Sequence, residues 1–333
     1  MFPTDSGPMW AAVVYDNDRG RIDLAVINNL ANTMSILYGY NSGSFRSQAI
    51  LSTGFSPRAI VVGDFNEDGR LDLVVANANS ANVGVFLRTD SGNFATQTTY
   101  PSVASPYSIA VGDFNGDGHL DFVVVGFYWA IMSVLLGTGN GSFGLPTILS
   151  TGSVGWSIAT GDFNGDGRLD IVIAYFSSAS VGVLLGTGNG SFGLQKTFST
   201  GRSPQFVTVG DVDGDGRLDL IVPNSSGMAV SVLLGIGNGS FKSQMTFSTG
   251  SGSSPYWLVV ADFNADGRLD FAVSDSSTSL LMIYTVEAGS ILSALGEKLD
   301  KTDDCAPPGA VCDGKIPCCN IKCRVNWGGA WCT

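Results

Sequence analysis

Short apolar runs separated by glycine-rich turns recur along most of the chain. In one unit, residues 59–62, 73–76 and 83–87 are almost entirely apolar, and a more polar stretch follows at 95–100. Continuous apolar runs of this length are typical of strands buried on both faces, and a polar fourth strand is typical of an outer edge. The pattern predicts an all-β protein assembled from four-stranded antiparallel units.

The unit repeats at a nearly fixed interval. An acidic string, Gly-Asp-Phe-Asn-x-Asp-Gly-Arg-Leu-Asp with small variations, occurs five times, and successive copies are 49, 49, 49 and 51 residues apart. A degenerate copy at residues 15–23 lies another 49 residues upstream. Four strands repeated at a period of about 40–50 residues indicate the blades of a β-propeller. We therefore predict a six-bladed propeller over residues 1–300; the alternative is a β-solenoid, whose period is usually shorter.

The acidic string has the ligand pattern of a calcium loop. Positions 1, 3, 5 and 9 carry side-chain oxygens, position 7 offers a backbone carbonyl, and the glycine at position 6 allows a sharp turn. Calcium prefers hard oxygen ligands, several of them carboxylates. The predicted side-chain ligands are Asp64, Asn66, Asp68, Asp72, Asp113, Asn115, Asp117, Asp121, Asp162, Asn164, Asp166, Asp170, Asp211, Asp213, Asp215, Asp219, Asp262, Asn264, Asp266 and Asp270. The predicted carbonyl ligands belong to Arg70, His119, Arg168, Arg217 and Arg268.

The charge of these loops favours bound metal. They contain 16 of the 29 acidic residues, and carboxylates packed this densely repel one another without a cation between them. Five complete copies predict about five calcium ions, which would change the formal charge from -12 to -2. The alternative is that the loops only form Asx turns. In the degenerate copy Tyr15 and Arg19 occupy positions 1 and 5, so we expect no metal there and a pairing of Arg19 with Asp23.

The acidic string also carries a family resemblance. Asp162-Phe163-Asn164-Gly165-Asp166-Gly167-Arg168-Leu169-Asp170 and its copies resemble FG-GAP/VCBS repeats, which are related to the blades of integrin α-subunit propellers and of some calcium-containing lectins. The resemblance implies a calcium-binding propeller in which the metal stiffens the blades and does no chemistry. For function it implies little, because such propellers serve adhesion, sugar binding, structural display and occasionally catalysis.

A second string, Gly-Thr-Gly-Asn-Gly-Ser-Phe, recurs between the third and fourth strands. It begins at Gly137 and Gly186 and, with isoleucine in place of threonine, at Gly235. Asn-Gly suits a tight hairpin turn, and each copy is also an Asn-x-Ser acceptor for N-glycosylation. The predicted glycosylation sites are Asn140, Asn189 and Asn238, with Asn224 as a fourth. The alternative is that asparagine serves the turn alone. We expect the last residues of the three strings, Phe143, Phe192 and Phe241, to pack between blades.

Antiparallel topology assigns these features to opposite faces. The first and third connections of a blade share one face, so the acidic loops and the predicted glycans lie together there. The other face and the channel mouth carry one variable residue per blade just before the first strand, at Arg58, Tyr107, Trp156, Gln205 and Tyr256. The second connection of the third blade adds Phe127, Tyr128 and Trp129. We predict that these aromatic residues bind a glycan or a protein partner; the alternative is packing between blades.

All six cysteines lie in the last 29 residues, at Cys305, Cys312, Cys318, Cys319, Cys323 and Cys332. The spacing predicts a separate disulfide domain at 301–333 in an oxidising compartment. Zinc is the alternative, although the single histidine, His119, lies far away in the sequence. The spacing resembles inhibitor cystine-knot peptides, which implies the pairs Cys305–Cys319, Cys312–Cys323 and Cys318–Cys332. We expect a secreted protein whose signal peptide has been removed, because none is visible at the first residues.

Several functional classes fit poorly. One histidine in an acidic loop disfavours Ser-His-Asp and Cys-His catalysis, so no enzyme is predicted, with a polysaccharide-active enzyme as a lesser alternative. Only 17 Lys and Arg argue against nucleic acid, and no apolar run is long enough to span a membrane. Residues 292–299 are a poor fourth strand, which leaves a sheet edge for another chain. The sequence favours a secreted structural or adhesive scaffold that contacts proteins or copies of itself; a glycan-binding lectin is the alternative.

The cysteine pattern generates a direct test. Under non-reducing conditions, mass spectrometry of the purified protein should find three disulfides within 301–333 and no free thiol, because so small a domain has too little core to fold without its bridges. Free thiols, or zinc retained by the protein, would remove the cystine-knot assignment and with it the main argument for secretion.

Overall fold

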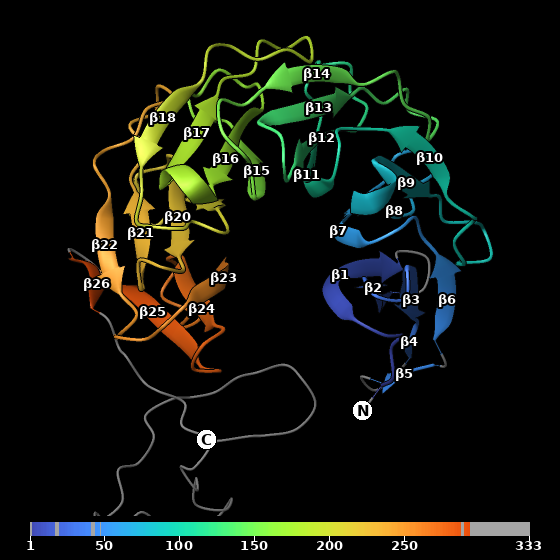
Figure 1. The fold of residues 1–333 in the computed structure, drawn as a ribbon, viewed down its shortest axis with the longest axis horizontal. Coiled ribbons are helices and arrows are strands. Elements are labelled where there is room, and N and C mark those ends of the chain that lie inside the picture. Colours follow the sequence, from blue (N-terminus) through green and yellow to red (C-terminus); the bar gives the residue numbers. More distant parts are fainter. Residues whose placement is uncertain (1, 17–19, 41–43, 47, 288–289, 294–333) are drawn as a thin grey trace, which may run out of the picture.

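The computed structural model of the protein describes residues 2–16, 20–40, 44–46, 48–287 and 290–293. The predicted disulfide domain at 301–333 and residue Arg19 lie outside this part of the chain. The described residues form six four-stranded antiparallel sheets, which we call blades 1 to 6 in chain order. Figure 1 shows them following one another around a common centre, with the first strand of each innermost and the fourth outermost.

The strands have the following bounds. Blade 1 contains β1 (Pro8–Asp16), β2 (Arg21–Asn28), β3 (Thr33–Leu37) and β6 (Ala49–Ser52), beside a ribbon of β4 (Gly39–Tyr40) and β5 (Ser44–Phe45). Blade 2 contains β7 (Pro57–Gly63), β8 (Asp72–Asn77), β9 (Asn82–Phe86) and β10 (Thr98–Pro101), and blade 3 contains β11 (Pro106–Gly112), β12 (Asp121–Gly126), β13 (Ile131–Leu135) and β14 (Thr147–Ser150). Blade 4 contains β15 (Ser157–Gly161), β16 (Asp170–Tyr175), β17 (Ser180–Leu184) and β18 (Lys196–Ser199). Blade 5 contains β19 (Thr208–Gly210), β20 (Asp219–Asn224), β21 (Ala229–Leu233) and β22 (Met245–Ser248), and blade 6 contains β23 (Pro255–Ala261), β24 (Asp270–Asp275), β25 (Leu281–Glu287) and β26 (Ser290–Ser293).

The predicted strand pattern is confirmed, with small shifts at the strand ends. In blade 2 the three apolar runs become β7, β8 and β9, and the polar fourth strand begins three residues later than the predicted stretch at 95–100. The helical content of the described residues is two short 3-10 turns, η1 (Ala78–Ser80) and η2 (Phe176–Ser178). No helix in that part of the chain has the length and apolarity needed to cross a membrane.

The hydrophobic core lies between the blades. Along β8, Leu73 and Val75 pack toward blade 1, whereas Val74 and Ala76 pack toward blade 3. Because both faces of the central strands meet a neighbouring sheet, every residue of β8 is buried, and the four residues between its terminal Asp72 and Asn77 are all apolar instead of alternating. Five such clusters join the consecutive blades from 1 to 6.

Blades 1 and 6 form the two ends of this series. Among the described residues no hydrophobic cluster joins them, and Figure 1 shows an opening between their sheets. Val259 and Leu281 on the free side of blade 6 are 47% and 45% exposed, whereas Met132, the counterpart of Leu281 in blade 3, is fully buried. Near the centre the two blades do touch, because the rings of Trp10 and Trp257 lie 4.1 Å apart, edge to face. The last sheet has a fourth strand, the four-residue β26, which pairs with β25.

A buried aspartate begins the second strand of blades 2 to 6, and in blade 1 the corresponding aspartate, Asp23, is the third residue of β2. In blade 3, Asp121 Oδ2 accepts the backbone N–H of Phe114 at 2.9 Å, and its Oδ1 accepts that of Gly137 at 2.7 Å. Both bonds recur at Asp72, Asp170, Asp219 and Asp270, with N···O distances of 2.7–3.0 Å. The aspartate therefore fixes the loop before its own strand to the start of the turn after the third strand.

Blade 1 completes this arrangement differently. Asp23 Oδ1 accepts the N–H of Gly39 at 2.7 Å, but its Oδ2 binds the guanidinium of Arg88 from blade 2 at 2.5 Å. Both side chains are almost completely buried. A guanidinium therefore does pair with Asp23, but the described one comes from Arg88 in the neighbouring blade; Arg19, to which the sequence assigned this role, is not described.

Removal of Arg88 tests this junction. Arg88→Met leaves the Asp23 carboxylate buried without its cation, so we expect the free energy of unfolding to fall by about 3–5 kcal/mol. Arg168→Met is the matched control, because Arg168 pairs with Asp166 on the surface at 3.7 Å and such pairs contribute about 1 kcal/mol or less. Denaturant titration of both variants gives the comparison, and equal small losses would contradict a structural role for the buried pair.

Candidate binding sites in the acidic loops and the central pocket

Each acidic loop is folded around its first aspartate. In blade 4, Asp162 Oδ1 accepts the N–H groups of Gly165 at 2.7 Å and Asp166 at 3.2 Å, and Oδ2 accepts that of Gly167 at 2.8 Å. Asn164 Nδ2 donates to Asp166 Oδ2 at 3.0 Å. In all five loops the N–H at position 7 donates to the position-5 aspartate at 2.9 Å. Positions 1, 3 and 5 thus converge, as the sequence predicts.

Blade 5 brings the most carboxylates together. Asp211, Asp213 and Asp215 each have an oxygen within 4.8 Å of the others, and no other set of three acidic, histidine or cysteine side chains in the described residues does so. The reason is local, because position 3 is aspartate in this loop and asparagine in the other four. The aspartates at position 9 have a different role, because their oxygens accept backbone N–H groups. The structural role of the position-9 aspartates was not predicted from the sequence. Calcium binding by the acidic loops stays a prediction.

The acidic loops also join neighbouring blades. The carbonyl of Phe65 in the blade 2 loop accepts the N–H of Gly141, which lies in the turn of blade 3, at 2.8 Å. Phe143 of the same turn packs against Phe65 with ring centroids 5.7 Å apart. The contacts recur between blades 3 and 4 and between blades 4 and 5. The prediction that the phenylalanines of the turns pack between blades is therefore confirmed.

The predicted glycosylation sites divide into two groups. Asn140, Asn189 and Asn238 lie on exposed turns, and their side-chain oxygens accept the N–H of the serine two residues later at 2.9–3.1 Å. Asn224 is fully buried at the end of β20, where its amide nitrogen donates to Ser231 Oγ at 2.8 Å. Asn224 was therefore wrongly assigned as a glycosylation site, because its nitrogen is inaccessible in the folded protein.

Burial changes the acidity of the ninth-position aspartates. It raises the pKa of Asp72 and Asp219 to about 6, reinforced by the charges of the loop carboxylates and opposed by the backbone hydrogen bonds. The same causes raise the pKa of Asp121 and Asp170. At neutral pH the loops therefore hold ionised groups that the surroundings disfavour, and a cation near them relieves that cost.

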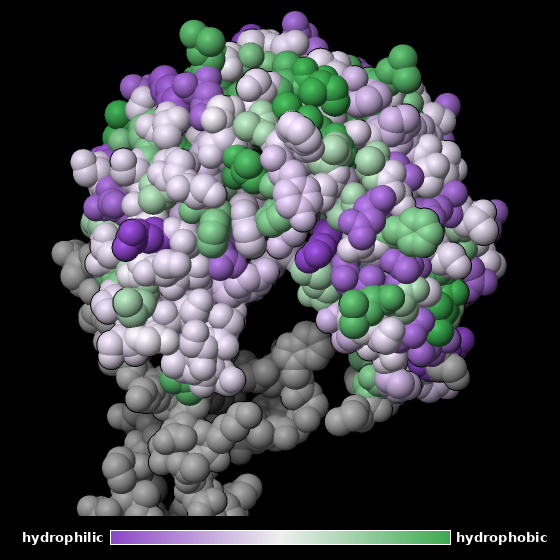
Figure 2. Space-filling view, in the orientation of Figure 1, coloured by the Kyte–Doolittle hydropathy of each residue, from purple (hydrophilic) through white to green (hydrophobic). Residues whose placement is uncertain are grey.

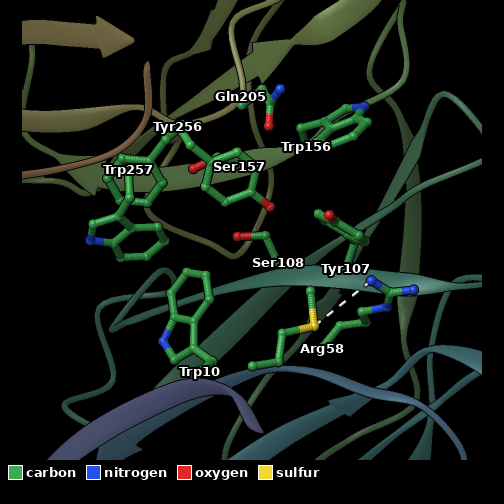
Figure 3. Close-up of a pocket in the computed structure, with 11 residues that line it drawn as sticks. Trp10, Arg58, Tyr107, Ser108, Trp156, Ser157, Gln205, Tyr256 and Trp257 are labelled. Atoms are coloured by element: carbon green, nitrogen blue, oxygen red, sulfur yellow. Dashed lines mark hydrogen bonds between the residues drawn. The ribbon is translucent and has the colours of Figure 1, made fainter. Parts of the chain in front are cut away.

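The opposite end of the first strands surrounds a central pocket of about 290 Å³. Each blade contributes residues that lie at the start of its first strand or just before it, and they occupy the same two positions of the repeat. The lining residues are Met9, Trp10, Arg58, Tyr107, Ser108, Trp156, Ser157, Gln205, Phe206, Tyr256 and Trp257. Figure 3 shows Trp10 and Trp257 on one side of this space and Trp156 on the other, with Tyr256 and the two serines between.

The pocket unites residues that the sequence singled out with residues that it did not. Arg58, Tyr107, Trp156, Gln205 and Tyr256 all line it, as their place before the first strand predicts. Trp10, Phe206 and Trp257 also line the pocket, and none of them was predicted as a partner residue. They lie one repeat position further along, so the same register comparison, extended by one residue, would have found them. Figure 2 shows a face whose apolar residues are mostly scattered and which is hollowed at its centre.

Aromatic contacts continue from the pocket onto the rim. Phe127 stacks on Tyr107 at 5.0 Å and contacts Trp156 at 5.1 Å, and Trp156 stacks on Phe176 at 4.6 Å. Beyond Phe127 the side chains of Tyr128 and Trp129 are 70% and 61% exposed. We call the pocket and this rim the aromatic face. Of the predicted partner residues, Tyr128 and Trp129 are largely exposed, although Tyr128 also contacts the edge of Phe127 at 4.7 Å, whereas Phe127 packs against several rings.

The repeat pattern agrees with a family of known proteins. The FG-GAP-like repeat family matches residues 15–75, 64–124, 125–173, 162–222 and 223–273, and the FG-GAP repeat matches 105–144. The chain belongs to the FG-GAP-like repeat family. The predicted resemblance is confirmed as an FG-GAP β-propeller, while calcium and the cystine knot remain predictions. No curated protein sequence matches the chain.

Solved structures share the fold of this FG-GAP propeller at low identity. A putative 6-phosphogluconolactonase from Bacteroides uniformis is 14% identical, with a TM-score of 0.65 over 86% of this chain and 84% of its own. A lectin from Agrocybe aegerita that recognises non-reducing terminal N-acetylglucosamine is 17% identical, with a TM-score of 0.59 over 86% and 79%. BBS1N, in complex with ARL6DN, is 14% identical, with a TM-score of 0.60 over 86% and 81%. These likenesses establish the fold alone.

Proposed function

We propose that this FG-GAP propeller is a secreted, calcium-stabilised binding scaffold without catalytic activity, and that it contacts its partners through the aromatic face. The observation that carries the proposal is the variation at the pocket. The acidic loops are close copies of one another, yet the residues at the pocket positions include methionine, arginine, tyrosine, tryptophan and glutamine. Acidic loops that are repeated almost unchanged, together with pocket residues that differ from blade to blade, are typical of a scaffold that presents a specific binding surface.

Calcium fits the donor set of the loops. The side chains of positions 1, 3 and 5 lie together in the loops, and in blade 5 they bring three carboxylate oxygens within 4.8 Å of one another, which suits a hard cation. The ninth-position carboxylates retain a second lone pair on each oxygen beside their backbone bonds. Bound calcium would supply positive charge to the loops and would stiffen the joints between blades. The degenerate loop of blade 1 would hold none, because Arg88 already binds Asp23 there.

Calcium removal should destabilise the protein. With excess chelator at pH 7 we expect a marked drop in the melting temperature relative to millimolar calcium, because the folded state alone offers the assembled loops. Scanning calorimetry measures it, with magnesium as the control ion. A melting temperature that is the same with chelator and with calcium would contradict the calcium assignment.

The pH dependence of folding stability is a second test of calcium binding. A carboxyl whose folded pKa exceeds its unfolded value costs stability when it is ionised, and this cost is absent below about pH 4 and complete above about pH 6 for Asp72 and Asp219. Without calcium, stability should therefore rise as the pH falls from 7 to 5. With calcium it should fall over the same range, because protons compete with the metal.

Secretion and glycosylation are both proposed from sequence features, and the exposure of three acceptor asparagines supports glycosylation. The cysteine-rich tail favours an oxidising compartment. Three of the four acceptor asparagines, Asn140, Asn189 and Asn238, lie on exposed turns on the loop face. Glycans there would leave the aromatic face free, because the two faces lie at opposite ends of the strands.

Two kinds of partner follow from different observations. Contacts between copies of the chain are favoured by the free sides of blades 1 and 6, where Val13, Ile22, Val259 and Leu281 are partly exposed although their counterparts between blades are more buried. Binding of a glycan is favoured by the aromatic walls of the central pocket. The lectin and lactonase names belong to proteins of less than 20% identity and add no weight to either.

The rim supplies the test of the working surface. Tyr128→Ser with Trp129→Ser should leave the melting temperature unchanged, because both side chains are exposed, and should weaken partner binding or assembly by a few kcal/mol if they are anchors. Leu145→Ser with Leu194→Ser is the matched control, since these side chains are at least as exposed and lie away from the pocket lining. Sedimentation and glycan-array binding provide the readouts. Normal assembly and normal glycan binding by the rim variant would move the interface elsewhere, first to the free side of blade 6.

A further inference from the structure

The charges around the central pocket are uneven. Arg58 is the one charged residue among those that line it. Its described contacts are the sulfur of Met9 at 3.8 Å from Nη1, drawn as a dashed line in Figure 3, and the Tyr107 ring, whose centroid lies 5.6 Å from the guanidinium carbon. Neither contact neutralises the charge. By contrast Arg70, Arg88, Arg168 and Arg217 each lie beside a carboxylate.

An unneutralised arginine in a strongly acidic chain points to an anionic group on the ligand. The formal charge of the protein is -12, and Arg58 differs from Arg202 and Arg268, which also have no carboxylate among their described contacts, because it lines the central pocket. The planar guanidinium forms its strongest hydrogen bonds with carboxylate and phosphate oxygens. Tyr107 supports Arg58 from one side and keeps it beside the pocket.

The remaining polar atoms of the pocket suit hydroxyl groups. Gln205 Nε2 donates to Ser225 Oγ at 2.8 Å, while Gln205 Oε1 is buried without a hydrogen-bond partner. Figure 3 shows this oxygen turned toward the other lining residues. A buried acceptor without a partner is costly, and a hydroxyl of a ligand would satisfy it.

Two serines add donors. Ser108 Oγ accepts the N–H of Ile158 and Ser157 Oγ accepts that of Val207, both at 3.3 Å, so each hydroxyl proton remains available. Burial and the neighbouring Tyr256 hydroxyl raise the pKa of Tyr107 to about 12, and its hydroxyl stays protonated. The polar atoms are thus spread around the pocket and are mostly able to donate.

The walls of the pocket are flat rings. Trp257 packs against Trp10 at 4.1 Å and against Phe206 at 4.0 Å, and Tyr107 and Trp156 lie 5.4 Å apart. A volume of about 290 Å³ lies just below the usual 300–1,000 Å³ of small-molecule sites, so it suits a ring-sized ligand and not a folded segment. Flat apolar walls with hydroxyl-binding groups at their edges match a sugar ring, which has apolar C–H faces and hydroxyls at its rim.

We propose that the central pocket binds a sugar ring that carries a carboxylate, a uronic acid, with Arg58 on the carboxylate, Gln205 on a hydroxyl and the aromatic walls on the ring faces. This assignment rests on the proposed function, because it names the ligand of the aromatic face. Free uronic acid and the end residue of an acidic polysaccharide share this chemistry.

Calorimetric titration of the full chain in calcium tests the assignment. The probes are glucuronate and galacturonate, the neutral sugars glucose and galactose, a galacturonate trimer, and trialanine as a non-sugar carboxylate. We expect at least one uronate to bind about ten times or more tightly than its neutral counterpart, because a charge-assisted hydrogen bond is about twice as strong as a neutral one. Tighter binding of the trimer than of the monomer would identify a polysaccharide as the source, and equal binding the free sugar.

Variants separate the parts of the pocket. Arg58→Gln should reduce uronate affinity to that of the neutral sugar and leave the melting temperature unchanged, while Arg202→Gln, an exposed arginine outside the pocket lining, should change nothing. Gln205→Leu, which removes the acceptor and keeps an uncharged side chain, should weaken uronates and neutral sugars alike. Neutral sugars binding as well as uronates, trialanine competing with them, or no sugar binding at all would each overturn the uronate assignment. If the rim variant still loses its partner in such a case, the proposed function stands and only the ligand assignment fails.

Discussion

A buried carboxylate at the start of the second strand is the interaction on which the rest of the propeller depends. In blade 3, Asp121 holds the N–H of Phe114 in the acidic loop and the N–H of Gly137 at the start of the next turn. The turn then reaches the loop of the preceding blade through Gly141, whose N–H binds the carbonyl of Phe65. Hydrogen bonds thus run from aspartate to loop to turn and on into the next blade. An aspartate is required because its two oxygens accept both N–H groups at once, and neither group has another partner in so buried a position.

This design has a cost that explains the acidic loops. Burial disfavours the ionised aspartate, and the loop carboxylates beside it add repulsion. A cation in the loop would offset both effects, and in blade 1 the guanidinium of Arg88 does so for Asp23. At this end of the sheets, hydrogen bonds join consecutive blades from blade 1 to blade 5, and the acidic loop is repeated with little change from blade 2 to blade 6. The other end is free to vary, which is why the pocket residues differ from blade to blade while the fold that presents them does not.

The sequence predicted the features that recur in every repeat, including the packing of Phe143, Phe192 and Phe241 between blades, and missed contacts that depend on which residues of different blades meet. Four strands, the acidic loop and the separation of the two faces follow from hydrophobic runs and repeat spacing, because those are local properties. The pairing of Asp23 with Arg88 joins residues 65 positions apart, so proximity in sequence favoured Arg19 instead. Asn224 matched an acceptor pattern that describes three residues, whereas its accessibility depends on the sheet packed around β20. The pocket was predicted in part. The position of Trp156 within the repeat identified it as a lining residue, but the contact of Trp10 with Trp257 depends on the circular arrangement of blades that brings the first and last blades together.

The most direct test of this account is amide hydrogen exchange at the joints between blades, measured with calcium and with chelator. The informative amides are those of Gly141, Gly190 and Gly239, which donate to the loop carbonyls of the preceding blades. If the acidic loops and their aspartates hold the blades together as one calcium-dependent unit, chelation should speed exchange at all three glycines by a similar factor, while amides at the centre of β12 and β16 change less. Exchange at the three glycines that is unaffected by calcium would contradict the account, because the joints would then be independent of the charge of the loops.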